Sequence, residues 1–224
     1  MIFSSDIEYK KTKLIKQGKS RIVEKFEHLA KWISENYKVN VLDIQEKFNE
    51  HDNGVRIAIH IETLKGELKL KMSEHWFSDI DPKKQREIAE KYIQIRNSLN
   101  DHKKSPKTND VFVVCFAFEQ LAKEEVNLLI PEKRIEKIYK ELNLTEIWTI
   151  SRCFENATLF VYEDGQKDKI KNSAKFKIIE DKYFDLLNEY DEFNYWKREK
   201  FEIRIDSKQN FDDNYESNWI HYYH

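Results

Sequence analysis

The chain contains few residues of the kinds that form phosphate-binding loops and flexible linkers: four glycines and three prolines in 224 residues. Glycine-rich phosphate loops need glycines at fixed spacings, because the backbone must approach the phosphate closely. Neither G-x-G-x-x-G nor G-x-x-x-x-G-K-[ST] occurs. The sequence therefore does not support a nucleotide site of either type, and it argues against long linkers between domains.

Cysteine and long apolar runs are also scarce. The two cysteines, Cys115 and Cys153, both fall in predicted strands, which indicates buried, unreactive thiols in a reducing compartment, although a disulfide between them remains open. The longest uncharged apolar run, Val111–Phe118, is too short to span a bilayer. The first residues lack the order of basic, apolar and small-residue regions that a signal peptide has. We therefore expect a cytoplasmic protein.

Charge is plentiful but nearly balanced, with 39 Lys and Arg against 41 Asp and Glu. Residues 1–40 hold nine basic against five acidic residues, residues 41–110 hold thirteen of each, and residues 111–224 hold seventeen against twenty-three. No strongly basic region exists, which disfavours a protein that coats nucleic acid. Charged residues make up 36% of the chain, a content that is also found in disordered proteins. Disordered chains contain few aromatic residues, however, and the 13% found here indicates a folded protein.

Charge placement in the second half predicts a four-stranded sheet. Val111–Phe118 and Ala157–Tyr162 carry no charge, as expected of central strands, whereas Glu146–Phe154 and Lys200–Asp206 carry charges typical of edge strands. Amphipathic helices are predicted after Pro131 and from Ser173. This order predicts an α+β fold with a ferredoxin-like βαββαβ module over residues 105–224, a fold that hosts many unrelated functions.

The first half, residues 1–104, reads as helix, three strands and helix. The predicted helices run from Ser20 to about Tyr37 and from Asp81-Pro82 onward, and the predicted strands are Val39–Phe48, Val55–Thr63 and Glu67–Met72. The predicted central strands of the second half carry no charge on either face, so we expect the first half to pack on the face of that sheet that its own helices leave open. The two halves could then form one composite domain. We detect no internal repeat.

The order α-β-β-β-α-β over roughly residues 20–118 resembles the core of the PD-(D/E)xK nuclease superfamily. The matching residues are Asp52 and then Glu67 and Lys69. The resemblance implies that two carboxylates hold a divalent metal ion and that the lysine assists the attacking water. The pattern departs from the family, because Asp52 falls in a predicted turn and Glu67 follows a glycine turn. In the alternative interpretation, Lys65-Gly66 forms a hairpin loop that places Glu62 opposite Lys69 as a simple ion pair.

The last nineteen residues combine acidic and aromatic side chains, with no Lys or Arg after Lys208. Trp and Tyr are frequent hot spots of protein interfaces, and carboxylates steer basic partners. The second interpretation is that these aromatic residues close the core as a terminal strand or helical turn. On the first interpretation the candidate binding residues are Asp212, Asp213, Glu216, Trp219, Tyr222 and Tyr223.

Taken together, the sequence favours a non-enzymatic cytoplasmic protein that binds another, basic protein, in the manner of an inhibitor or immunity protein. This interpretation requires no cofactor, no metal ion and no membrane. Its alternative is the metal-dependent nuclease that would use Asp52, Glu67 and Lys69, and nucleic acid is an expected partner only in that alternative.

Overall fold

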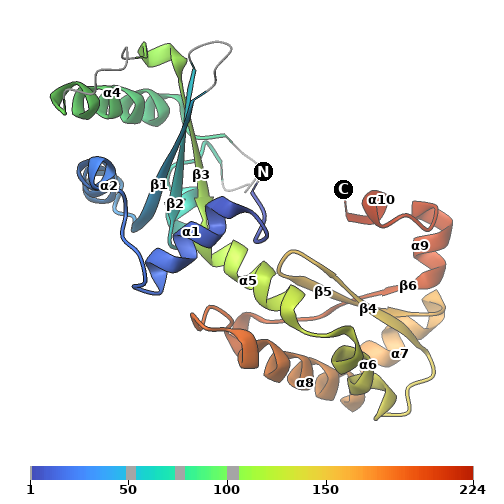
Figure 1. Ribbon diagram of the computed structural model, residues 1–224. Helices are drawn as coiled ribbons and strands as arrows, with labels where there is room; N and C mark the ends of the chain where they lie inside the picture. Colours follow the sequence, from blue (N-terminus) through green and yellow to red (C-terminus); the bar gives the residue numbers. More distant parts are fainter. Residues whose placement is uncertain (1, 49–53, 74–78, 100–105, 224) are drawn as a thin grey trace. The chain divides into compact units, whose positions relative to one another are not determined.

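The computed structural model describes residues 2–48, 54–73, 79–99 and 106–223. These residues form an α+β fold with two three-stranded mixed sheets, divided into two compact units, Met1–Leu121 and Ala122–His224 (Figure 1). The division falls inside helix α5 (Phe118–Leu129). The sequence placed the boundary after residue 104, and the difference arises because the strand that follows belongs to the first unit.

The first unit packs two helices on one face of its sheet. In the sheet, β1 is antiparallel to β2 with Ile44 opposite Ile59, and β2 is parallel to β3 with Ile57 opposite Val113. Side chains of α2 and α4, including Phe26, form a core with these strands. In chain order the elements are α1 (Ile7–Lys16), α2 (Glu24–Tyr37), β1 (Val41–Phe48), β2 (Val55–Ile61), α3 (Leu64–Leu68), α4 (Pro82–Ser98), η1 (Thr108–Asp110) and β3 (Val111–Ala117).

Helix α1 and the first turn of α5 lie against the other face of this sheet. Tyr9 of α1 is fully buried and stacks on Phe118, with 5.3 Å between the ring centroids. Thr12 donates a hydrogen bond to the buried carboxylate of Asp43 at 3.1 Å. Because neighbouring residues of a strand point to opposite faces, Asp43 reaches α1 while Ile44 enters the core under α2 and α4.

The second unit has the same kind of sheet. Here β4 is antiparallel to β5, with Ile150 opposite Leu159, and β5 is parallel to β6, with Leu159 opposite Ile205. Helices α6 and α8 pack on one face through apolar side chains such as Ile138 and Ile179. The elements are α6 (Glu132–Lys140), β4 (Ile147–Cys153), β5 (Asn156–Val161), η2 (Asp164–Gln166), α7 (Lys167–Lys171), α8 (Ala174–Tyr190), η3 (Arg198–Lys200), β6 (Arg204–Ser207), α9 (Lys208–Tyr215) and α10 (Trp219–Tyr223).

The predicted four-stranded ferredoxin-like sheet is wrong within the described residues, because β3 pairs with β2 and not with a strand of the second unit. Strand β2 is buried on both faces: Ile59 points into the core, and Ala58 and His60 on the other face are also buried. It is the central strand of its sheet, and the uncharged residues Val111–Ala117, which were predicted to form a central strand, form the edge strand β3 beside it.

The predicted strand Glu67–Met72 is also wrong, and with it the predicted hairpin pairing of Glu62 with Lys69. The segment begins as the short helix α3, which Thr63 caps by accepting a hydrogen bond from the Gly66 amide at 3.1 Å. Glu62 instead forms an ion pair with Lys16 and accepts a hydrogen bond from Asn40 at 2.7 Å.

The two units repeat one order of elements: helix, antiparallel strand pair, short helix, a 17-residue helix, parallel strand and helix. The loops after the second strands are held in the same way. The Leu64 amide donates to the side chain of Glu119 at 3.2 Å, and the Asp164 amide donates to the side chain of Gln209 at 3.2 Å. The chain therefore contains a repeat in topology that is not visible as a repeat in its sequence.

Both cysteines are free thiols. Burial raises the pKa of Cys115 to about 12 and also raises the pKa of Cys153, which is only half-buried. Both side chains are thus protonated and weakly reactive at neutral pH. None of the helices in the described residues is long and apolar enough to cross a membrane.

Candidate functional site

The two C-terminal helices, α9 and α10, pack on the face of the second sheet that lies opposite α6 and α8. Phe160 of β5 is fully buried beneath Trp219, with ring centroids 5.3 Å apart. Trp219 also stacks on Phe211 at 4.2 Å and on Trp148 at 5.8 Å. The aromatic side chains of α9 and α10 therefore close the core of this unit, and part of the tail has a packing role.

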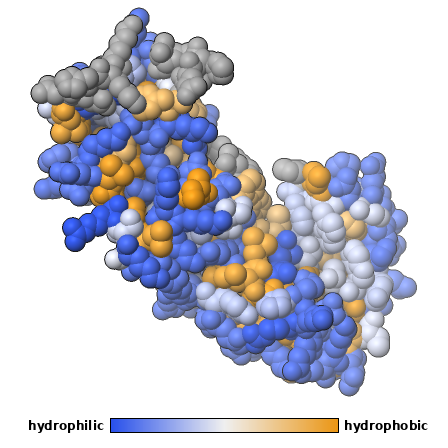
Figure 2. Space-filling view, viewed as in Figure 1, coloured by the Kyte–Doolittle hydropathy of each residue, from blue (hydrophilic) through white to orange (hydrophobic). Residues whose placement is uncertain are grey.

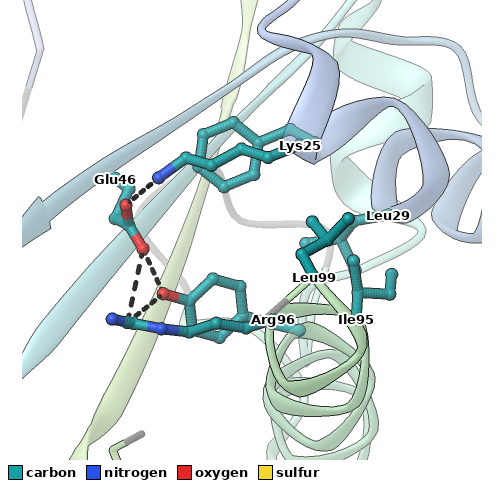
Figure 3. A pocket seen from close by; sticks show the side chains of 8 residues that line it. Lys25, Leu29, Glu46, Ile95, Arg96 and Leu99 are labelled. Atoms are coloured by element: carbon teal, nitrogen blue, oxygen red, sulfur yellow. Dashed lines mark hydrogen bonds and ion pairs between the residues drawn. The ribbon is translucent and has the colours of Figure 1, made fainter. Parts of the chain in front are cut away.

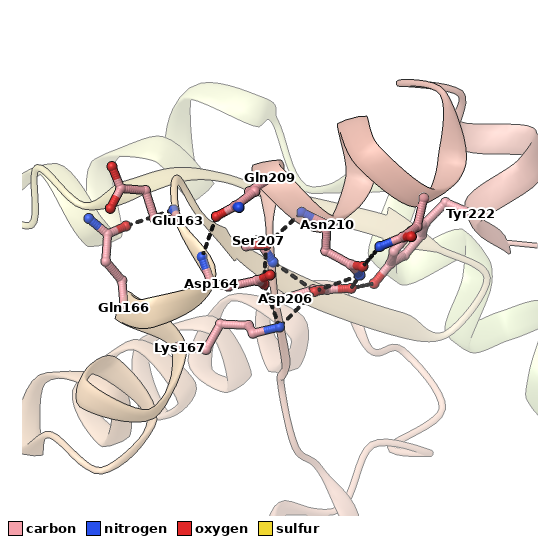
Figure 4. A network of polar contacts seen from close by, with 10 residues as sticks. Glu163, Asp164, Gln166, Lys167, Asp206, Ser207, Gln209, Asn210 and Tyr222 are labelled. Carbon is pink, nitrogen blue, oxygen red and sulfur yellow. Dashed lines mark hydrogen bonds and ion pairs between the residues drawn. The ribbon is translucent and has the colours of Figure 1, made fainter.

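A polar network anchors both terminal helices to β6 (Figure 4). Asp206 accepts hydrogen bonds from the Asn210 amide group at 3.0 and 2.9 Å and from the Tyr222 hydroxyl at 2.7 Å. Ser207 caps α9 by accepting from the Asn210 backbone at 2.8 Å, and its hydroxyl donates to Asp164 at 2.7 Å. These bonds fix the start of α9 and the end of α10 on the same strand.

Lys167 is the cation of this network and lies between two of its carboxylates. Lys167 lies 2.7 Å from a carboxylate oxygen of Asp164 and 3.6 Å from one of Asp206. Its hydrogen bond, with that of Ser207, lowers the pKa of Asp164. Burial, followed by the hydrogen bond to Asp206, raises the pKa of Tyr222, so its hydroxyl remains a donor at neutral pH. Ser207 is fully buried and acts as a helix cap, so this set of side chains holds the tail in place.

The outward side of the tail is apolar at its centre. Trp219 is 37% exposed, and Ile220 is 66% exposed, more than any other large hydrophobic side chain in the described part of the chain. Figure 2 shows hydrophobic surface at α10 beside surface of intermediate hydropathy. Asp213 and Glu216 precede this pair in sequence and are exposed. We call Asp213, Glu216, Trp219 and Ile220 the tail surface.

The other predicted binding residues make hydrogen bonds within the unit, and Glu216 of the tail surface itself lies 3.6 Å from Nδ1 of His221. Asp212 pairs with Lys208 and accepts from Ser217 at 2.6 Å, and together these bonds lower the pKa of Asp212. Tyr222 is bonded to Asp206, as described above, and Tyr223 donates to Ser151 at 2.7 Å. These three residues support the fold of the tail.

Sequence reasoning missed Ile220, which lies between Trp219 and His221 in a polar stretch. An apolar residue in such a place is ordinarily buried, and nothing in its neighbours distinguishes an exposed isoleucine from one that closes the core.

Of the residues predicted for the nuclease alternative, Glu67 and Lys69 do not lie on a strand. Asp52 lies outside the described residues. Glu67 lies in α3 and is 4% exposed; its carboxylate accepts from the Ala117 amide at 3.0 Å and pairs with Lys71 at 2.8 Å. Lys69 donates instead to the carbonyl oxygen of Lys38 at 2.6 Å.

Burial raises the pKa of Glu67, against the opposing effect of Lys71. A buried carboxylate held by its own lysine and a backbone amide has a structural role in joining α3 to β3. Across the described ranges, no group of three or more His, Cys, Asp or Glu side chains is placed to hold a metal ion.

Comparisons of the chain with protein-family models, with curated proteins and with solved structures find no match.

Proposed function

We propose that this chain is a non-enzymatic protein that binds a basic protein through the tail surface and sequesters it, as inhibitor and immunity proteins do. The observation that carries the proposal is the exposure of Trp219 and Ile220 on α10, a helix that the hydrogen bond from Tyr222 to Asp206 holds against β6. Exposed apolar side chains on a mobile terminus would lose entropy on binding, whereas α10 is already ordered by Tyr222 and Asp206. A rigid aromatic and aliphatic pair of this kind is typical of an interface hot spot.

Charge defines the class of partner. The second unit contains 17 Lys and Arg against 22 Asp and Glu, a net charge of −5, whereas the first unit contains 22 against 19, a net charge of +3. Asp213 and Glu216, which precede the apolar pair in the sequence, add exposed negative charge. A surface with this composition attracts a positively charged protein and accelerates its association at low salt.

The proposal is tested by capture of proteins from the native cytoplasm on the immobilised full chain, at low and high salt. Two variants alter the tail surface: Ile220→Asp, and the double variant Asp213→Lys with Glu216→Lys. The matched control is Asp185→Lys with Glu199→Lys, which reverses two exposed charges of the same unit away from the tail. Far-UV circular dichroism checks that all variants are folded.

We expect a basic protein to be retained by the wild type and the control, released by high salt and lost from both tail variants. Ile220→Asp should weaken the complex at least tenfold, about 1.4 kcal/mol, because it places a charge in the centre of the interface. A captured protein that binds both tail variants as well as it binds the wild type would contradict the proposal.

A further inference from the structure

A separate cavity of about 290 Å³ opens in the first unit, among α2, β1 and α4 (Figure 3). Lys25 comes from α2, Glu46 from β1, and Arg96 from the last turn of α4. Its volume lies near the lower end of the range for small-molecule sites, roughly 300–1,000 Å³. The cavity is therefore large enough for a small organic molecule.

One wall of the cavity is polar and already ordered. Glu46 forms an ion pair with Lys25 and accepts a hydrogen bond from the Tyr92 hydroxyl. Arg96 donates to that hydroxyl at 3.0 Å and lies 3.8 Å from Glu46. Burial and the hydrogen bond to Glu46 raise the pKa of Tyr92, so it remains a donor. The lining residues thus carry two cations against one carboxylate.

Burial strengthens the effect of the excess positive charge among the lining residues. The side chains of Arg96 and Glu46 are only 4% and 6% exposed, whereas that of Lys25 is 42% exposed. In a partly dehydrated site the extra positive charge interacts more strongly with a ligand charge than it would in water. Lys25 lies at the edge of the cavity, where an arriving anion can reach it.

The opposite wall is apolar. Leu29 and Ile95 face the space across from the charged groups, and Leu99, which is 51% exposed, lies beside them (Figure 3). A ligand that fits both walls therefore has a negative charge at one end and a hydrocarbon body at the other.

We propose that this cavity is a binding site for small apolar carboxylates, with the carboxylate beside Lys25 and Arg96 and the hydrocarbon part against Leu29, Ile95 and Leu99. This proposal is independent of the tail surface.

The test measures octanoate binding to the full chain by isothermal titration calorimetry, with 1-octanol as the uncharged probe of the same chain length. Lys25→Met removes one cation and keeps the length of the side chain. The matched control is Lys31→Met, on the same helix, where the lysine is 73% exposed. Neither substitution removes a buried group, so both variants should fold.

We expect saturable octanoate binding that Lys25→Met weakens about tenfold and Lys31→Met leaves unchanged, with much weaker binding of 1-octanol. The absence of octanoate binding would overturn the proposal. Equal affinity for the alcohol, or equal affinity of the Lys25→Met variant, would also overturn it.

Discussion

His60 is a buried histidine at the centre of the first sheet. It is fully buried on β2, and neither ring nitrogen has a hydrogen-bond partner among the described residues. Its ring lies 5.9 Å from that of Phe116. Burial first, and the positive charge of Arg56 second, lower its pKa from 6.5 to about 4. The neutral ring is therefore a structural side chain that the fold keeps unprotonated.

The first prediction concerns pH. Because the folded pKa of His60 is lower than the unfolded one, the unfolded chain takes up the proton first, and stability falls as pH decreases from 6.5 toward 4. Each pH unit in this window costs about 1.4 kcal/mol. Between pH 6.5 and 5.0 the wild type should therefore lose about 2 kcal/mol more unfolding free energy than His60→Leu, measured with urea. Identical losses in the two proteins would show that His60 does not titrate on unfolding.

A second residue-scale prediction concerns the buried hydrogen bond between Tyr183 and Asn127. The Tyr183 hydroxyl donates to the Asn127 side-chain oxygen at 2.6 Å, and the Asn127 amide group donates to the carbonyl oxygens of Phe154 and Asn156. Tyr183→Phe should lower the unfolding free energy by about 1–3 kcal/mol, because it leaves a buried acceptor unsatisfied. Tyr139→Phe, at a buried ring on α6 outside this network, is the control and should cost less. Equal losses of unfolding free energy in Tyr183→Phe and Tyr139→Phe would show that the hydrogen bond to Asn127 does not stabilise the fold.

At the scale of elements, α3 packs so closely on β2 that Gly66 has no room for a side chain. A Cβ at Gly66 would lie 2.8 Å from Cγ2 of Ile61, a buried side chain. Alanine favours a helix over glycine by about 1 kcal/mol, but overpacking a core costs about 1–3 kcal/mol. Gly66→Ala should therefore destabilise the protein in thermal unfolding.

Gly165 is the matched control, because a Cβ there meets nothing within 4 Å. Gly165→Ala should leave the melting temperature unchanged or slightly raised. A Gly66→Ala variant as stable as the wild type would show that α3 moves easily away from β2.

The same segment shows where sequence patterns fail. Leu68, Leu70 and Met72 alternate with charged residues, which predicts a strand, yet Leu70 is fully buried and Met72 is 57% exposed. Helix α3 has only five residues, which is too few to distinguish the 3.6-residue period of a helix from the two-residue period of a strand. The helix begins at a local cap, in which the Thr63 side chain accepts from the Gly66 amide three residues later, and the alternating pattern conceals this signal.

The two 17-residue helices, α4 and α8, were predictable because they carry both an apolar pattern and a cap. Asp81 accepts from the Lys84 amide at 3.1 Å at the start of α4, and Ser173 accepts from the Phe176 amide at 3.2 Å at the start of α8, which confirms both predicted helix starts. Strand membership was not predictable, because the absence of charge in Val111–Ala117 indicates burial and not which sheet the strand joins; these residues form an edge strand, β3, beside β2.

At the scale of the whole molecule, the chain uses one topology twice and gives the two copies different surfaces. The first unit carries a net charge of +3 and an open cavity with an excess of cations, and the second carries −5 and an exposed apolar pair. The sequence allowed the acidic tail to be identified as a candidate. It could not show which aromatic residues face inward, because Trp219, Tyr222 and Tyr223 belong to one short helix.

The most direct test of the proposed binding function is the association rate of the captured basic partner with the full chain, measured at low and high ionic strength. We predict that Asp213→Lys with Glu216→Lys lowers the association rate at low salt and reduces its dependence on salt, whereas Asp185→Lys with Glu199→Lys changes both less. Equal rates and equal salt dependence for the tail variant and the control would contradict the assignment of the tail surface as the binding site.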